Sequence, residues 1–228
     1  MAVSMVWISR ATKSVLLPVT DNAPTKDPLD PLWEKADEAA KNGDIVGALF
    51  IWKAIAEKGV WQIYARIGEI YETGANGVEK DIQKALYWYR KAVFEGDDPI
   101  AHVGLGRAYY LGIGIEQNLT SALGHFERAF SHGSIEAALY LGVMYHRGDA
   151  VERDSRRAKQ YLRIAAAKEY YYAYAELARV AFDEKRFLNG IYVLAKSLFL
   201  GIRISLKNSH DPRLLGIERS HGLTNSRR

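Results

Sequence analysis

Apolar residues recur at helical spacing along most of the chain, and they do so in a repeating unit. The motif Leu/Ile-Gly-x-x-Tyr-x-x-Gly occurs three times, beginning at Ile67, Leu105 and Leu141, in steps of 38 and 36 residues. A weaker copy begins at Leu177. Periods of this length are typical of stacked helix pairs, in which each pair packs only on its neighbours. The pattern therefore predicts an all-α chain of about five helix-turn-helix repeats.

Each central repeat has the same order of signals. A first helix with apolar residues at i, i+4 and i+8 is followed by a glycine-containing loop and then by Asp81, Asn118 or Asp154, four residues before an alanine. Asp and Asn favour helix N-caps because the side-chain oxygen accepts a hydrogen bond from a free backbone N–H. We expect these three residues to begin the second helix of each pair.

Glycine recurs inside the predicted first helices, at Gly68, Gly106 and Gly142. A glycine in a helix interior costs about 1 kcal/mol relative to alanine, so its repetition needs a reason. We expect the partner helix to approach closely at each of these positions.

The ends of the chain depart from the central pattern. The sequence predicts a partly extended N-terminal arm at 1–29, a first helix pair at 30–60, three similar pairs at 61–170, a degenerate last pair at 171–201 and a basic C-terminal tail at 202–228. Atypical end pairs are expected of capping repeats.

Charge and cysteine content narrow the function classes. The formal net charge is +4, and residues 203–228 alone carry six basic and two acidic residues, so the rest of the chain is neutral and we expect no nucleic-acid partner. The chain has no cysteine, which excludes disulfides, thiolate metal sites and a cysteine nucleophile. We expect no membrane span, and the N-terminal apolar stretch precedes its basic residues, the reverse of a secretory signal. These features predict a cytoplasmic protein.

Signals for catalysis are weak throughout. The six histidines form no His-x-x-x-His pair, and His102 and His125 fall at helix-packing positions. Gly104 and Gly106 resemble part of a phosphate loop but lie inside a predicted helix. We expect no catalytic residues, no metal, no cofactor and no enzymatic activity.

The central repeats resemble Sel1-like repeats, which are relatives of tetratricopeptide repeats. The stretch Gly77-Val78-x-x-Asp81-x-x-x-Ala85-x-x-Trp88-Tyr89-x-x-Ala92-x-x-x-Gly96 is a nearly complete copy of the second half of that motif. The shorter first pair is more similar to a plain tetratricopeptide repeat. The resemblance implies a right-handed α-solenoid superhelix that binds a partner protein or peptide on its concave face, as a scaffold or adaptor. Bacterial proteins of this kind also include immunity proteins, so a dedicated inhibitor of one enzyme or toxic effector is the alternative.

The resemblance also implies which residues face a partner. In this repeat class the first helix of each pair lines the concave face, and its inward positions place these residues there: Glu69, Glu72, Arg107, Tyr110, Leu111, His146, Arg147, Arg179 and Phe182. Aromatic residues and arginine are enriched at binding hot spots. We expect a partner segment with acidic and apolar side chains, or else coverage of the face by the chain's own arm or tail. A homodimer through the arm or the terminal repeats is a further possibility.

Overall fold

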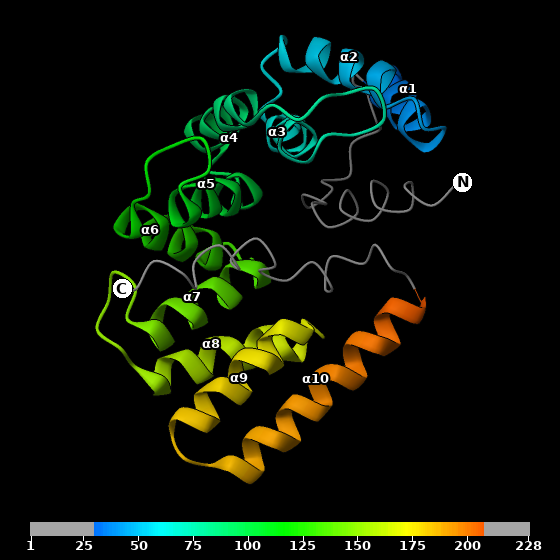
Figure 1. The fold of residues 1–228 in the computed structure, drawn as a ribbon. Helices are drawn as coiled ribbons and strands as arrows, with labels where there is room; N and C mark the ends of the chain where they lie inside the picture. Colours follow the sequence, from blue (N-terminus) through cyan, green and yellow to red (C-terminus); the bar gives the residue numbers. More distant parts are fainter. Residues whose placement is uncertain (1–29, 208–228) are drawn as a thin grey trace, which may run out of the picture. The chain divides into compact units, whose positions relative to one another are not determined.

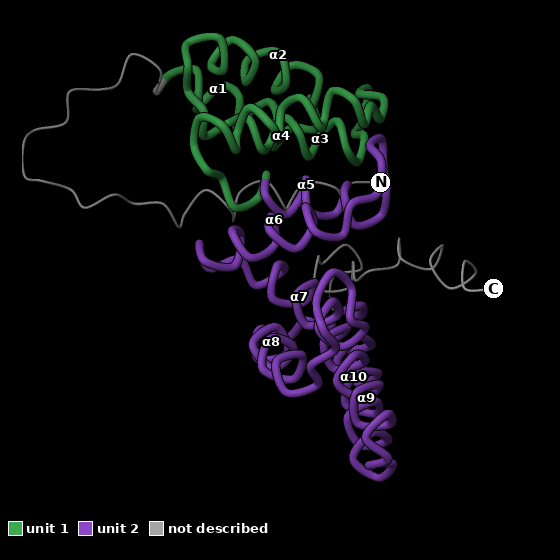
Figure 2. Tube along the Cα trace, turned by 90° about the vertical axis from the view of Figure 1, so that its left-hand side faces the viewer, with its two compact units in different colours: residues 1–101 green, residues 102–228 purple. Residues whose placement is uncertain are grey.

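The computed structural model describes residues 30–207, and the predictions for the arm and for residues 208–228 lie outside that range. Within it the chain is all-α with no β-strand, and antiparallel helix pairs follow one another in chain order inside each compact unit (Figure 1). This confirms the predicted solenoid fold class. The chain divides into two compact units at Ala101 and His102, which Figure 2 colours separately.

Unit 1 holds two helix pairs. Its helices are α1 (Asp30–Lys41), α2 (Ile45–Ala56), a short 3₁₀ turn η2 (Trp61–Ile63), α3 (Tyr64–Thr73) and α4 (Ile82–Gly96). Helix α1 packs on α2 and α3 packs on α4. Asn42 and Gly43 follow the end of α1, and Asp44 then caps α2 by accepting a hydrogen bond from the Gly47 N–H at 2.8 Å.

Unit 2 holds the remaining helices. They are α5 (Pro99–Leu111), which begins in unit 1, α6 (Leu119–Ser131), α7 (Ile135–Arg147), α8 (Ser155–Ala167), α9 (Tyr171–Asp183) and α10 (Phe187–Lys207). Helix α7 packs on α6 and α8, and α9 packs on α8 and α10. Each helix is therefore held by its neighbours in the sequence, as the repeat pattern predicts.

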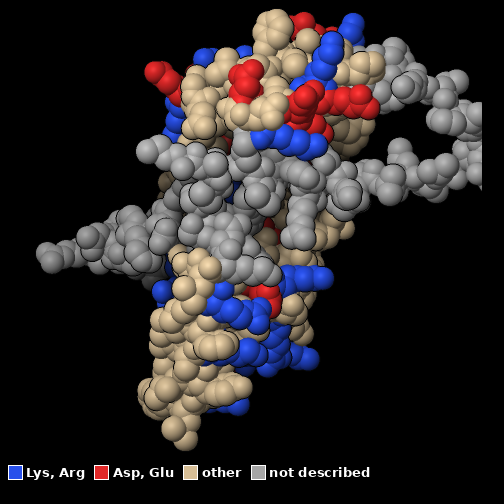
Figure 3. All heavy atoms as spheres, turned by 90° about the vertical axis from the view of Figure 1, so that its right-hand side faces the viewer, with Lys and Arg blue, Asp and Glu red and all other residues tan. Residues whose placement is uncertain are grey.

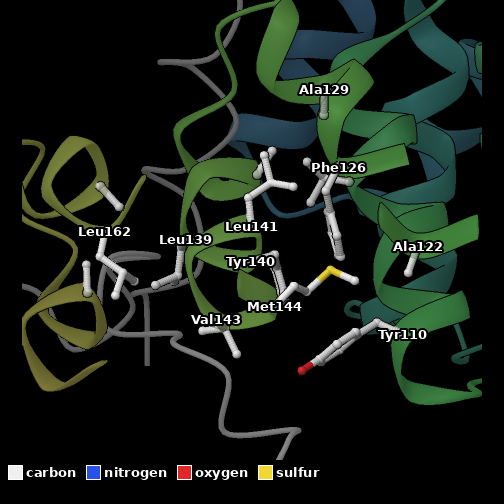
Figure 4. Close-up of a cluster of buried hydrophobic side chains, with 14 of the residues drawn as sticks. Tyr110, Ala122, Phe126, Ala129, Leu139, Tyr140, Leu141, Val143, Met144 and Leu162 are labelled. Carbon is white, nitrogen blue, oxygen red and sulfur yellow. The ribbon is translucent and has the colours of Figure 1, made fainter. Parts of the chain in front are cut away.

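The core of unit 2 is built from the apolar stripes of these helices. Figure 4 shows Phe126 of α6 and Tyr140 and Met144 of α7 meeting between the two helices. The Phe126 and Tyr140 rings are stacked, with centroids 4.5 Å apart, and Leu162 of α8 is fully buried. Stacked aromatic pairs contribute roughly 0.5–1.5 kcal/mol beyond the area that they bury. The stripe of α7 thus joins the helices before and after it.

The predicted N-caps are confirmed at all three positions. Asp81 accepts from the Lys84 N–H at 3.0 Å, Asn118 from the Ser121 N–H at 2.9 Å, and Asp154 from the N–H groups of Arg156 and Arg157. Each cap residue has extended backbone geometry before the helix begins.

The structure also confirms why glycine recurs inside the first helices. A Cβ added to Gly68, Gly106 or Gly142 would lie 2.6 Å from a side-chain atom of the partner helix: the Tyr89 ring, the Phe126 ring or Leu162 Cγ, respectively. Each glycine therefore allows a large side chain of the second helix to rest against the backbone of the first.

Helix α10 differs most from the prediction. It continues past Gly201, where the last pair was expected to end, and runs to Lys207. Its segment Phe187–Leu206 is long and apolar enough, by length and composition alone, to cross a membrane, so the expectation of no membrane span stays a prediction. The basic residues Lys196 and Arg203 interrupt the run in sequence, but the helix continues through both.

Candidate protein-interaction face

Polar side chains from the first helices of successive pairs meet on one face of unit 2. We call this the first-helix face and define it by Arg107 and Tyr110 of α5, His146 and Arg147 of α7, and Glu176 of α9. Hydrogen bonds and ion pairs join α5 to α7 and α7 to α9 across this face. Polar side chains therefore link the three first helices along this side of unit 2, where Arg147 and Arg179 are exposed.

At the α5 end, Arg107 is held by an acidic residue of the next repeat. Its Nη1 donates to Oε1 of Glu136 at 3.0 Å, and both side chains are partly buried. Glu136 thus balances the positive charge of Arg107 within the face. The sequence did not indicate this pairing.

Tyr110 is buried rather than exposed. Only 1% of its surface is accessible, and its ring packs edge-on against Phe126 and Tyr140. Burial raises the pKa of the phenol above its usual value, and Arg147 opposes that rise. The expectation of an exposed aromatic anchor at Tyr110 was wrong, because the repeat places this position against the core of unit 2.

The Tyr110 hydroxyl hydrogen-bonds both to Asp149, in the loop after α7, and to Arg147, at the end of α7. It donates to Oδ2 of Asp149 at 2.8 Å and accepts from Nη1 of Arg147 at 3.3 Å. Arg147 itself is exposed. A neutral tyrosine therefore fixes the position of an accessible cation.

His146 sits between α7 and α9 and is 8% exposed. Its Nε2 lies 3.5 Å from Oδ2 of Asp183, which also pairs with Arg153 at 2.5 Å. Burial lowers the pKa of His146, although the nearby carboxylates of Asp183 and Glu176 oppose this shift. We therefore treat the imidazole as neutral at pH 7.

Two buried acceptor atoms on this face have no hydrogen-bond partner among residues 30–207. They are Nδ1 of His146 and Oε2 of Glu176, a residue that is 4% exposed. The other carboxylate oxygen of Glu176 accepts from Nη1 of Arg179. In the tautomer that carries its hydrogen on Nε2, the nitrogen 3.5 Å from Oδ2 of Asp183, Nδ1 can only accept. An unpaired buried polar atom costs roughly 1–3 kcal/mol, so a donor that reached either atom after the surrounding side chains rearranged would stabilise the protein.

The other residues expected on the face have mixed positions. Arg179 is exposed, whereas Leu111 packs against the core of unit 2. The Phe182 ring is turned toward α10, since its Cε1 lies 2.6 Å from the position that a Cβ on Gly190 would occupy. Leu111 and Phe182 therefore pack within unit 2 instead of pointing toward a partner.

Unit 1 contributes two of the expected residues. Glu69 is exposed, but Glu72 is 8% exposed and accepts a hydrogen bond from the Tyr89 hydroxyl at 2.7 Å. Glu72 thus joins α3 to α4, and the prediction that it faces a partner was wrong.

His102 and His125 lie at packing positions, as the sequence predicted, and the structure shows that they pack against each other. Their Nδ1 atoms are 2.9 Å apart, and His125 stacks on Tyr109 with a centroid separation of 5.6 Å. Burial and then the neighbouring His102 lower the pKa of His125 to about 4. No group of three or more His, Asp or Glu side chains within residues 30–207 is arranged to hold a metal ion.

Comparison with known proteins assigns the repeats. The Sel1 repeat family matches residues 64–96, 99–134 and 135–170. The chain is 38% identical over 104 residues to the ERAD-associated E3 ubiquitin-protein ligase component HRD3B of Arabidopsis thaliana, covering 45% of this chain and 16% of that protein. It is 29% identical over 132 residues to protein sel-1 homolog 2 of Mus musculus, and this match covers 56% of this chain and 19% of that protein. The chain thus spans less than a fifth of either relative.

Solved structures show the same fold. A Sel1 repeat protein from Oxalobacter formigenes superposes with a TM-score of 0.59 at 27% identity, over 74% of this chain and 70% of that one. The protective antigen c5321 of uropathogenic Escherichia coli, described as having an SLR fold, gives a TM-score of 0.60 at 22% identity, over 81% and 43%. This chain therefore carries three Sel1 repeats, over residues 64–96, 99–134 and 135–170.

Proposed function

We propose that the chain is a scaffold or adaptor that binds a segment of a partner protein on the first-helix face of unit 2. Sel1 repeat proteins are generally protein-interaction scaffolds, and an α-solenoid typically offers an extended surface rather than a catalytic cavity. The observation that supports the site most strongly is the pair of buried acceptors without partners, His146 Nδ1 and Glu176 Oε2, on neighbouring helices α7 and α9.

The ionic pairing within the face changes the kind of partner that we expect. Arg107 is paired with Glu136 and Arg179 with Glu176, so an acidic segment would have to displace carboxylates already in place. The unsatisfied atoms on α7 and α9, His146 Nδ1 and Glu176 Oε2, are both acceptors. We therefore propose a segment that supplies N–H donors at α7 and α9, either from an extended backbone or from amide and basic side chains. Arg147 would contact it from the exposed edge.

The test begins with the full chain as bait in a lysate of the source cell. Partners identified by mass spectrometry are then purified, and their affinities are measured by isothermal titration calorimetry. Glu176→Gln replaces one carboxylate oxygen with a donor, so we expect a loss of about 1–2 kcal/mol, or roughly 5- to 30-fold in Kd. Arg147→Glu should also weaken binding.

The matched control is Arg163→Glu, which makes the same charge reversal at an exposed position on α8, a second helix of its pair. We expect it to bind as tightly as the wild type. A partner that binds Glu176→Gln and Arg147→Glu normally but loses affinity for Arg163→Glu would place the site elsewhere and contradict the proposal. The effect of binding on the partner's own activity distinguishes an adaptor from an inhibitor.

A further inference from the structure

Helix α10 is apolar on two opposite sides. Its inner side carries Gly190, Ser197, Leu200 and Ile204, which are all buried and face α9. The Ser197 hydroxyl donates to the Tyr171 carbonyl at 2.9 Å, and Gly190 lies under the Phe182 ring. The opposite side is exposed, although helices that are apolar all round normally lie in a core or a membrane.

We define the outer α10 face by Leu188, Ile191, Tyr192, Leu198, Phe199 and Ile202, all of which are exposed. Leu188 and Phe199 are 86% and 69% accessible. Of the fifteen exposed large apolar side chains in residues 30–207, nine belong to α10. Figure 3 views the molecule from the side of α10. The exposed surface there is mostly uncharged, with Lys and Arg along one border.

The spacing along this face is that of a helix-pairing seam. Leu188, Ile191, Ala195, Leu198 and Ile202 follow one another at intervals of three and four residues. Such a repeat keeps one stripe of a helix turned toward a partner helix over several turns. Ala195 is small and lies near the middle, where it would allow two helices to approach closely. No Asp, Glu, Lys or Arg lies within the stripe.

The size of the face suits a stable protein interface. Side chains at these accessibilities expose roughly 700 Å² of apolar surface, above the roughly 300–600 Å² of the largest patch on a typical monomer. A standard interface buries about 800 Å² per partner. Internal helix α8, by contrast, exposes a single large apolar residue, Ile164, because the next pair covers its apolar side.

A membrane-spanning role fits this structure less well. Helix α9 is packed along α10 and carries Glu176 and Arg179. If α10 crossed a bilayer with its neighbour, these charged groups would enter the hydrocarbon at a cost of several kcal/mol. A surface that is apolar, uncharged and spaced for a helix can instead pair with an identical surface, because a two-fold axis brings the same residues together.

We propose that the outer α10 face pairs with the same face of a second copy, antiparallel, about a two-fold axis near Ala195 and Leu198. This interface lies within unit 2 and leaves the first-helix face to other partners. Because an isologous contact closes on itself, the product is a dimer rather than a filament.

The test is the mass of the full chain in solution by sedimentation velocity across a range of concentrations. We expect twice the 25.6 kDa of one chain. Phe199→Glu should give the monomer mass with an unchanged circular dichroism spectrum. Phe94→Glu is the matched control, since Phe94 is an exposed phenylalanine on α4, and it should remain dimeric.

A second measurement uses the absence of cysteine from the chain. A single Ala195→Cys substitution should form a disulfide-linked dimer on oxidation, whereas Phe94→Cys should not. A wild-type monomer at all concentrations would overturn the proposal, as would a dimer that persists in Phe199→Glu. If the wild-type protein were monomeric and sedimented with vesicles of phosphatidylcholine and phosphatidylglycerol, and Phe199→Glu did not, the outer α10 face would bind a membrane surface instead of a second copy.

Discussion

Substitution of Gly142 tests the packing rule on which the repeat depends. An alanine Cβ there would lie 2.6 Å from Leu162 Cγ, 2.7 Å from Cδ2 and 3.2 Å from the Leu162 backbone nitrogen. Cγ and the backbone cannot swing aside, so α8 must move away from α7. Overpacking of this kind costs about 3 kcal/mol, and the better helix propensity of alanine returns about 1 kcal/mol. We expect Gly142→Ala to lower the free energy of unfolding by about 2 kcal/mol.

Gly124 is the matched control because it is an exposed interior residue of α6 and a Cβ there meets nothing within 4 Å. Gly124→Ala should therefore stabilise the protein by roughly 0.5–1 kcal/mol. Urea unfolding followed by circular dichroism at 222 nm measures both variants. At roughly 2–4 °C per kcal/mol, Tm should fall for Gly142→Ala and rise for Gly124→Ala. If Gly142→Ala were as stable as Gly124→Ala, close helix approach would not be the reason for the repeated glycine.

Two further predictions concern a cap and a histidine. Asp154→Ala removes the acceptor for two N–H groups at 2.8 and 2.9 Å and should cost about 1 kcal/mol in urea unfolding, whereas Asp154→Asn should retain most of the stability. The folded-state pKa of His125, about 4, lies below its value of roughly 6.5 in the unfolded chain, so the unfolded state binds the proton first and stability falls as pH drops from 6.5 toward 4. Because His125 is partly exposed, we expect a loss of about 1–2 kcal/mol, absent in His125→Gln; an equal loss in that variant would assign the pH dependence to other groups.

The helices and their caps could be predicted because their causes are local. Asp81, Asn118 and Asp154 hydrogen-bond within three residues of their own positions, and Gly68 meets a residue at a fixed offset in the same repeat. A period of about 36 residues therefore carries this information directly.

The pairing across the first-helix face could not be predicted in the same way. The family pattern places Arg107 and Tyr110 on the correct helix, but their partners Glu136 and Asp149 come from a helix start and a loop in the next repeat, where no residue type recurs. The acidic residues are what decide whether an arginine is available to a partner. Sequence reasoning missed Glu136, Asp149 and Arg153 for this reason. It also missed Glu176, although its partner Arg179 lies three residues away on the same helix.

Helix α10 was mispredicted because its limits depend on tertiary contacts. Gly201 looked like a helix end, yet a Cβ there would be in ordinary contact, at 3.4 Å, with the Tyr171 ring of α9. Arg203 pairs with Glu169, which keeps a charged residue within the helix beyond that glycine. Packing on α9 thus supports a longer helix than the sequence signals indicate.

Hydrogen–deuterium exchange of the chain, alone and bound to its purified partner, tests the proposed binding face most directly. Amides that a partner contacts or stabilises exchange more slowly. We predict added protection in the C-terminal half of α5, in α7 and in α9, with little change in α6 and α8. Protection confined to α6, α8 or the outer face of α10 would contradict the account.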